Sequence, residues 1–141
     1  KQHCTNAEKV VAFLQKHKNV DRVIYPTLHE GEIAARSKKY FNGGNGALVG
    51  IEVKGGVEAG KKFIEALKMF YHVANIGDAR SLAIHPATTT HSQLTEQELL
   101  AAGVTPGYVR LSIGIEHPDD IIADLDQALN ASGGAKLKAV S

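Results

Sequence analysis

The residue of this sequence best placed for chemistry is Arg110, in the run YVRLSIGI at 108–115. Apolar residues at every second position of this run predict a strand, and its period of two sends Arg110 to the face opposite those side chains. The neighbours on the face of Arg110 include Ser112 and Gly114, which are small and leave room around the guanidinium. A guanidinium stays charged at neutral pH and binds a carboxylate or phosphate through two hydrogen bonds. We therefore expect Arg110 to bind an anion; the alternative is an ordinary surface ion pair with an acidic residue.

Two polar segments precede this strand. Asn75 lies in the extended run HVANIGDARS (72–81), where its amide could supply a second hydrogen bond to an anion. The alternative is a turn residue before Gly77. The run IHPATTTHSQL (84–94) places Thr89 and Thr90 in a polar elbow between a strand-like segment and a helix. Their hydroxyls could line a binding site or could form turns and helix caps.

Three other groups lack the pattern that their chemistry requires. His85 and His91 are six residues apart without a clustered cysteine or carboxylate, so no metal site is expected. Adjacency to a histidine does not by itself make Cys4 a reactive thiol. The run NGGNG (42–46) lies between a predicted helix and a predicted strand, whereas phosphate-binding loops run from a strand into a helix. We expect it to be a turn.

The hydrophobic pattern predicts one α+β domain of about four strands and five helices. Expected strands are 22–26, 47–53, an extended stretch at 72–84, and 108–115. Expected helices are 5–14, 30–41, 57–70, 95–103 and 118–129. In the helix at 30–41, Ile33, Ser37 and Tyr40 or Phe41 are expected to face inward.

Composition limits the partners and the compartment. The 141 residues carry 16 basic and 15 acidic side chains with few aromatic ones, which argues against nucleic acid or a membrane as partner. With Cys4 as its single cysteine and no apolar run of about 18–20 residues, the chain is expected to be cytoplasmic. Its sole methionine is Met69, and we expect the chain to be a piece of a longer protein.

Four segments together resemble a known family. They are HCTNAEKVVAFLQKH (3–17), GALVGIEVKGGVEAGKKFIEALKMF (46–70), NIGDARSLAIHPATTTHSQL (75–94) and GVTPGYVRLSIGIEHPDDIIADLDQAL (103–129). They resemble the C-terminal domain of the pyridoxal-phosphate enzymes of cysteine and methionine metabolism, with the pattern HPA(S/T)-x-TH followed by G-x-VRLS-x-G-x-E. Asn75, where lyases of this family carry serine, favours the O-acetylhomoserine sulfhydrylase branch.

The resemblance implies a two-domain enzyme. Residues 1–131 would be the C-terminal substrate-binding domain, with a mostly antiparallel sheet and helices packed on one face, and residues 132–141 a flexible tail. A large N-terminal domain, absent from this chain, would bind pyridoxal 5'-phosphate through a lysine, an aspartate and phosphate-binding groups. Lys61 and Lys62 lie on the solvent side of a predicted helix, so this fragment is expected to bind no cofactor and to be inactive alone.

The resemblance also implies the roles of four residues. Arg110 matches the arginine that binds the α-carboxylate of the amino-acid substrate, and Asn75 matches a position that helps to hold the same group. Thr89 and Thr90 match the threonine-rich wall of the active site, whereas no catalytic residue is expected in this fragment. The substrates would be O-acetylhomoserine and sulfide, the products homocysteine and acetate, and the full-length enzyme a homo-oligomer, usually a tetramer.

Two alternatives remain open from the sequence. The first is another member of the family, such as cystathionine gamma-synthase or methionine gamma-lyase. The second is a non-catalytic amino-acid-binding module, because the cofactor-binding motifs are missing.

Overall fold

The structure, a computed structural model, describes residues 1–89, 93, 96–101 and 104–133. Its helices and strands alternate irregularly along the chain, and the predicted α+β class is confirmed. In chain order the elements are α1 (Gln2–Leu14), β1 (Val20–Ile24), a 3-10 turn (Pro26–Leu28), α2 (Gly31–Tyr40), β2 (Leu48–Val53), α3 (Gly56–Ala66), β3 (Tyr71–His72), β4 (Leu82–Ile84), a second 3-10 turn (Pro86–Thr88), α4 (Glu96–Ala101), β5 (Tyr108–Ser112) and α5 (Pro118–Ser132).

The strands form one sheet in the order β1-β2-β5-β4-β3. All neighbouring pairs are antiparallel except β3 and β4, which confirms a mostly antiparallel sheet. The described residues contain five strands, where about four were expected. The difference arises at 71–84, where β3 and β4 are two short parallel strands separated by the loop at 73–81.

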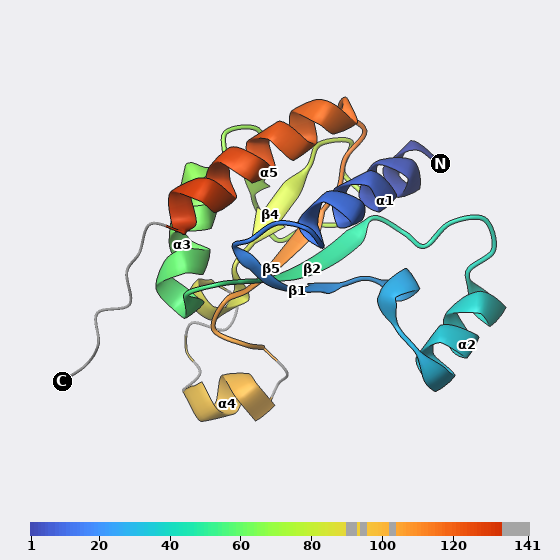
Figure 1. The fold of residues 1–141 in the computed structure, drawn as a ribbon, viewed down its shortest axis with the longest axis horizontal. Coiled ribbons are helices and arrows are strands. Elements are labelled where there is room, and N and C mark those ends of the chain that lie inside the picture. The colour runs from blue at the N-terminus through green and yellow to red at the C-terminus, as the bar shows by residue number, and fades with distance from the viewer. Residues whose placement is uncertain (90–92, 94–95, 102–103, 134–141) are drawn as a thin grey trace.

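Helices α1, α3 and α5 cover one face of the sheet, as Figure 1 shows. The core between the two layers is continuous, and Val109, Leu111 and Ile113 are fully buried in it. The predicted alternation of β5 is therefore confirmed for these residues. Ile115, expected on the same face, is 50% exposed, because the strand ends at Ser112 and the alternation stops there.

Helix α2 departs from the expected packing. Ile33 and Tyr40 were expected to face inward but are 53% and 69% exposed, and Phe41 and Ser37 are not buried either. The helix lies beyond the edge strand β1 and contains no buried residue (Figure 1). The helix contacts the 3-10 turn at Pro26–Leu28, but this contact leaves its large apolar side chains exposed.

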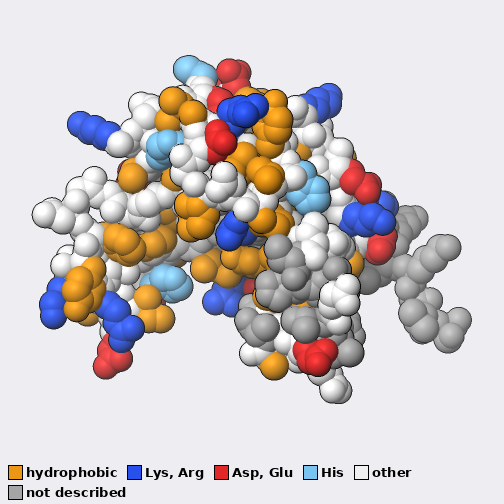
Figure 2. Space-filling view, turned by 180° about the vertical axis from the view of Figure 1, so that it is seen from behind, with side chains coloured by type: hydrophobic (Ala, Val, Ile, Leu, Met, Phe, Trp, Pro, Cys, Tyr) orange, Lys and Arg blue, Asp and Glu red, His pale blue; other side chains and the backbone are white. Residues whose placement is uncertain are grey.

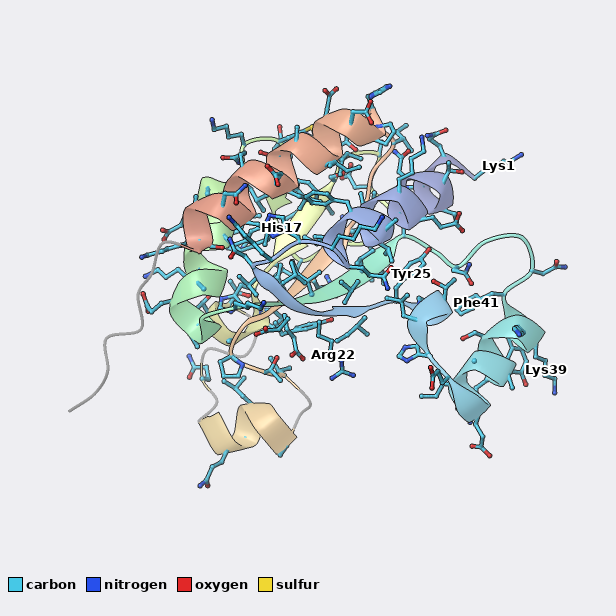
Figure 3. The ribbon with its side chains drawn as sticks, in the orientation of Figure 1. Lys1, His17, Arg22, Tyr25, Lys39 and Phe41 are labelled. Atoms are coloured by element: carbon cyan, nitrogen blue, oxygen red, sulfur yellow. The ribbon has the colours of Figure 1, made fainter. Side chains whose placement is uncertain are left out.

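The segment between β1 and β2, which includes α2, is held at its two ends by Tyr25. This residue lies between β1 and α2 (Figure 3). Its hydroxyl donates a hydrogen bond to the carbonyl of Gly46 at 2.9 Å. Burial, with the nearby Glu8 charge adding to it, raises the pKa of Tyr25 to about 12. Tyr25 therefore ties the two ends of the segment between β1 and β2 together as a neutral donor.

Helix boundaries differ from the sequence prediction by a few residues. Helix α1 begins at Gln2, before the expected start at Thr5, whose hydroxyl donates to the Lys1 carbonyl. Helix α3 ends at Ala66, short of the expected end at residue 70. Helix α5 begins at Pro118 as predicted and continues to Ser132. The segment 134–141, most of the expected tail, lies outside the described residues. A search of the described helices finds no membrane-spanning segment among them.

The early end of α3 is held by a buried carboxylate on α5. Asp124 accepts hydrogen bonds from the backbone N–H groups of Lys68 and Met69, at distances from 2.9 to 3.2 Å. The side chain of Gln127 donates to the same carboxylate at 3.0 Å. These bonds satisfy N–H groups of the segment that follows the helix, and they join α3 to α5.

We expect Asp124→Asn to destabilise the 141-residue chain. The amide retains one acceptor oxygen where the carboxylate has two, so buried N–H groups lose a partner at a cost of about 2 kcal/mol. Thermal and urea unfolding would measure the change, with Glu65→Gln on the exposed face of α3 as the control. Equal stability of the two variants would contradict the role of Asp124.

Candidate functional site

The face of the sheet opposite the helices carries Arg110. Arg110 lies on β5 with Gly50 of β2 on one side and Ile84 of β4 on the other. Gly50 has no side chain, and a Cβ there would lie 2.8 Å from Cε2 of Tyr108, so the ring of Tyr108 lies against this glycine. Burial raises the pKa of the Tyr108 phenol, and the charge of Arg110 opposes the shift. Tyr108 and Arg110 therefore share one environment on this face.

The room around the guanidinium differs from the expected arrangement. Ser112 and Gly114 were expected to leave open space, but both are buried. A Cβ at Gly114 would lie 2.5 Å from the carbonyl oxygen of Ala79, so the chain passes directly over this glycine. The ring of Tyr108 therefore occupies the space over Gly50 on one side of Arg110, and the segment that precedes β4 lies over Gly114 on the other.

This covering segment brings Asn75 to Arg110. Residues 73–80, which we call the Asn75 loop, are exposed apart from the half-buried Asp78. Arg110 Nη2 donates to the carbonyl oxygen of Asn75 at 3.5 Å, a long hydrogen bond. The side-chain oxygen of Asn75 accepts from the N–H of the next residue, Ile76, at 2.9 Å. Two predicted site residues thus meet although they are 35 positions apart.

The charge of Arg110 has no acidic partner in the described part of the chain. The ion pairs of Arg and Lys side chains there join Arg22 to Glu52, Lys54 to Asp21 and Arg80 to Asp78. An arginine that is held on a strand without an acidic partner can bind the carboxylate of a ligand. Its planar guanidinium donates two parallel hydrogen bonds to such a group.

Large apolar side chains are exposed on this side of the molecule. Val73 and Ile76 belong to the Asn75 loop, Tyr71 precedes it and Ile115 follows β5. Figure 2, which views the molecule from the side opposite Figure 1, shows hydrophobic side chains gathered around a few basic ones. Exposed apolar side chains that gather in this way are typical of a face that another protein surface or a ligand covers.

The polar elbow is stabilised from within. Thr89 donates through its hydroxyl to the carbonyl of His85 at 2.8 Å, and its N–H donates to the carbonyl of Pro86. No hydrogen bond joins Thr89 to Arg110 or Asn75 among the described residues. Thr90, also predicted to line the site, lies outside the described residues.

His85, to which the sequence assigned no role, organises this elbow. It is completely buried, and its Nε2 lies 2.8 Å from the carbonyl oxygen of Pro106 while Nδ1 lies 3.0 Å from the hydroxyl of Thr88. A carbonyl only accepts, so Nε2 carries the proton and Nδ1 accepts from Thr88. A Cβ at Gly60 would lie 2.7 Å from Nε2, which places the ring directly against α3. Two sequence features could have indicated this contact. They are Pro86, which follows His85, and Gly60, a residue without a side chain within the apolar face of α3.

The described residues contain no group suited to hold a metal or a cofactor. No cluster of three His, Cys, Asp or Glu side chains able to bind a metal is found among them. Every lysine in the described ranges is exposed, including Lys61 and Lys62. A lysine bonded to pyridoxal phosphate is ordinarily enclosed with the cofactor, so these lysines do not fit that role.

Comparisons with known proteins agree on one family. The family model described as Cys/Met metabolism PLP-dependent enzyme matches residues 1–130. An O-acetyl-L-homoserine sulfhydrylase of Leptospira meyeri is 58% identical over 128 residues, which are 90% of this chain and 29% of that protein. An L-methionine gamma-lyase of Fusobacterium nucleatum subsp. polymorphum is 50% identical over 130 residues, with 90% of this chain and 32% of that protein covered.

A solved structure shares the fold. A Campylobacter jejuni protein described as an O-acetylhomoserine (thiol)-lyase, crystallised with N'-pyridoxyl-lysine-5'-monophosphate, superposes with a TM-score of 0.83 at 45% identity. The match covers 92% of this chain and 31% of that one. The chain thus spans 29 to 32% of the length of these three relatives.

The burial of His85 predicts a pH-dependent stability. Burial lowers the pKa of His85 from its ordinary 6.5, partly offset by the hydrogen bond to Pro106. The unfolded chain therefore binds more protons than the folded one below pH 6.5, and the free energy of unfolding falls as the pH is lowered from there towards the folded pKa. The slope from this group is at most about 1.4 kcal/mol per pH unit.

Urea unfolding of the 141-residue chain between pH 5 and 8 would measure this dependence. His85→Gln should lower stability at pH 8 and flatten the acid slope, because the titrating group is gone. His29→Gln, which does not contact the hydrogen-bonded group of His85, Thr88 and Pro106, serves as the control. An acid slope that His85→Gln leaves unchanged would contradict the assignment.

Proposed function

Because the chain belongs to the family of Cys/Met metabolism PLP-dependent enzymes, we propose that it is the substrate-binding part of an O-acetylhomoserine sulfhydrylase. The full-length enzyme makes homocysteine and acetate from O-acetylhomoserine and sulfide. Residues 1–131 form its C-terminal domain. The choice of branch rests on the sulfhydrylase relative at 58% identity, compared with 50% for the lyase.

Arg110 binds the α-carboxylate of the amino-acid substrate in this proposal. The observation that carries it is an arginine on the open face of a central strand, beside an exposed loop and without an acidic partner in the described part of the chain. Binding the carboxylate orients the amino acid, so that its reacting atoms are held in place before chemistry begins. Asn75 sets the other side of the carboxylate pocket, and Thr89 and Thr90 belong to its wall.

The cofactor belongs to the rest of the full-length protein. Pyridoxal phosphate acts as an electron sink for bond cleavage next to the amino group of its substrate. The lysines in the described part of this chain do not fit a site for it, so the part of this domain is to bind and orient the substrate. We place the exposed apolar face around Arg110 against the large domain, because this buries surface that the fragment leaves in water. The enzyme is a cytoplasmic homo-oligomer, a tetramer in the usual arrangement of the family.

A second candidate is methionine gamma-lyase, since a relative with that name is 50% identical over 130 residues. Asn75, at the position where lyases carry serine, favours the sulfhydrylase. The two are separated by incubating the full-length enzyme with O-acetylhomoserine and sulfide or with methionine alone. Homocysteine and acetate from the first mixture, with little methanethiol from the second, support the sulfhydrylase.

Arg110→Ala in the full-length enzyme should lower kcat/KM for O-acetylhomoserine by about 100-fold or more, because the carboxylate loses its charged partner. Steady-state kinetics and the pyridoxal phosphate content would be measured together, and the content should not change. Arg22→Ala is the matched control, since Arg22 lies on the same face but pairs with Glu52. Wild-type kinetics in Arg110→Ala would exclude the carboxylate role.

The 141-residue chain alone should show no stoichiometric spectral change on titration with pyridoxal phosphate, because its described lysines are all exposed. Absorbance titration and reduction with borohydride would test this, with the full-length enzyme as positive control. A saturable one-to-one change abolished by replacing a single lysine would contradict it.

A further inference from the structure

The C-terminal end of the Asn75 loop is attached to the body of the domain by side-chain hydrogen bonds. Glu116 lies after β5 and its carboxylate reaches across to Ser81, the first residue after the loop. The N–H of Ser81 donates to Oε1 at 2.6 Å and the hydroxyl of Ser81 donates to Oε2 at 2.9 Å. Both carboxylate oxygens are therefore used to hold one residue, which is completely buried.

Two further bonds complete this attachment. The Ser81 hydroxyl also accepts from the N–H of Gly114 at 2.9 Å, and the N–H of Ile115 donates to the carbonyl of Ala79 at 2.9 Å. The chain passes so close to Gly114 that any side chain there would meet Ala79. Glu116, Ser81 and Gly114 together form what we call the Glu116 clamp.

The Glu116 clamp is itself anchored to helix α1. Asn6 is completely buried and donates through its side-chain nitrogen to the carbonyl oxygens of Gly114 at 3.1 Å and Glu116 at 2.8 Å. Gln2 in turn donates to the side-chain oxygen of Asn6 at 2.8 Å. The backbone of Glu116 is thus fixed against the helical layer. Its side chain forms its hydrogen bonds with Ser81.

The remaining contacts of the Asn75 loop are local or weak. Arg80 stacks on the ring of Tyr71 at 4.3 Å, and Asp78 accepts from the Arg80 N–H within the loop itself. The bond from Arg110 to the Asn75 carbonyl is 3.5 Å long. Apart from the β3–β4 pairing at its two ends and the bond of Ala79 to Ile115, the position of the loop relative to Arg110 therefore depends on Ser81.

We propose that Glu116 is a positioning residue for the amino-acid substrate. By clamping Ser81 to the end of β5 it sets the height of the Asn75 loop above Arg110, and so the width of the pocket that receives the α-carboxylate. This inference rests on the proposed function for its substrate, whereas the clamp itself is a property of the fold. Glu116 does not touch the substrate and acts through the loop.

Glu116→Gln in the full-length enzyme tests the proposal. Glutamine keeps the size of the side chain but has one acceptor oxygen, so one of the two Ser81 donors loses its partner. KM for O-acetylhomoserine should rise about tenfold while kcat changes less than about threefold and KM for sulfide stays unchanged. Hydrogen–deuterium exchange of the amides in residues 73–81 should become faster.

Ser81→Ala provides an independent variant because it removes the hydroxyl from the other side of the clamp. If both act through the same loop, the double variant should raise KM less than the product of the two single effects. Glu65→Gln, an exposed acid on α3, is the matched control and should leave KM and loop exchange unchanged.

The outcomes separate the two proposals. Unchanged KM and unchanged loop exchange in Glu116→Gln would overturn the positioning role, as would a fall in kcat and melting temperature at constant KM. If the wild-type full-length enzyme does not turn over O-acetylhomoserine, the proposed function fails. Loop exchange in Glu116→Gln then still decides whether Glu116 positions the loop.

Discussion

Burial of one face of β5 against the helical layer determines where the chemistry of this domain can occur. Val109, Leu111 and Ile113 are fully buried in the core beneath the helices. Successive side chains of a strand point to opposite faces, so burying these three leaves Arg110 on the open face whatever its own preference. A register shift of one residue would put the guanidinium in the core and the apolar side chains in water. The position of the charge is therefore guaranteed by hydrophobic packing on the far side of the sheet.

The second requirement of the site is long-range. The Asn75 loop reaches Arg110 because the chain leaves the sheet after β3 and returns in β4 parallel to it. The return is fixed by buried hydrogen bonds among Ser81, Gly114 and Glu116. Rigid support of this kind is what a binding site needs, since loops alone position side chains poorly.

Local patterns predicted much of this fold and less of the site. Alternation predicted the buried face of β5, and five helices were expected near the places where five occur in the described residues. The face of Arg110 followed from the same alternation. The contact of Arg110 with Asn75 did not follow from local patterns, because a contact between residues 35 positions apart depends on sheet topology. The errors have one physical origin: Ile33 and Tyr40 of α2, and Ile115, have the apolar character of core residues but are at least half exposed. Periodicity identifies an apolar face without identifying what covers it.

The central claim, that this open face binds the carboxylate of an amino acid, is tested most directly by a crystal structure of the full-length enzyme with an unreactive amino acid bound. The account predicts both terminal nitrogens of Arg110 within hydrogen-bonding distance of the two carboxylate oxygens, with the backbone of Asn75 bordering the same group. A carboxylate bound by other residues, with Arg110 directed into bulk water, would contradict it.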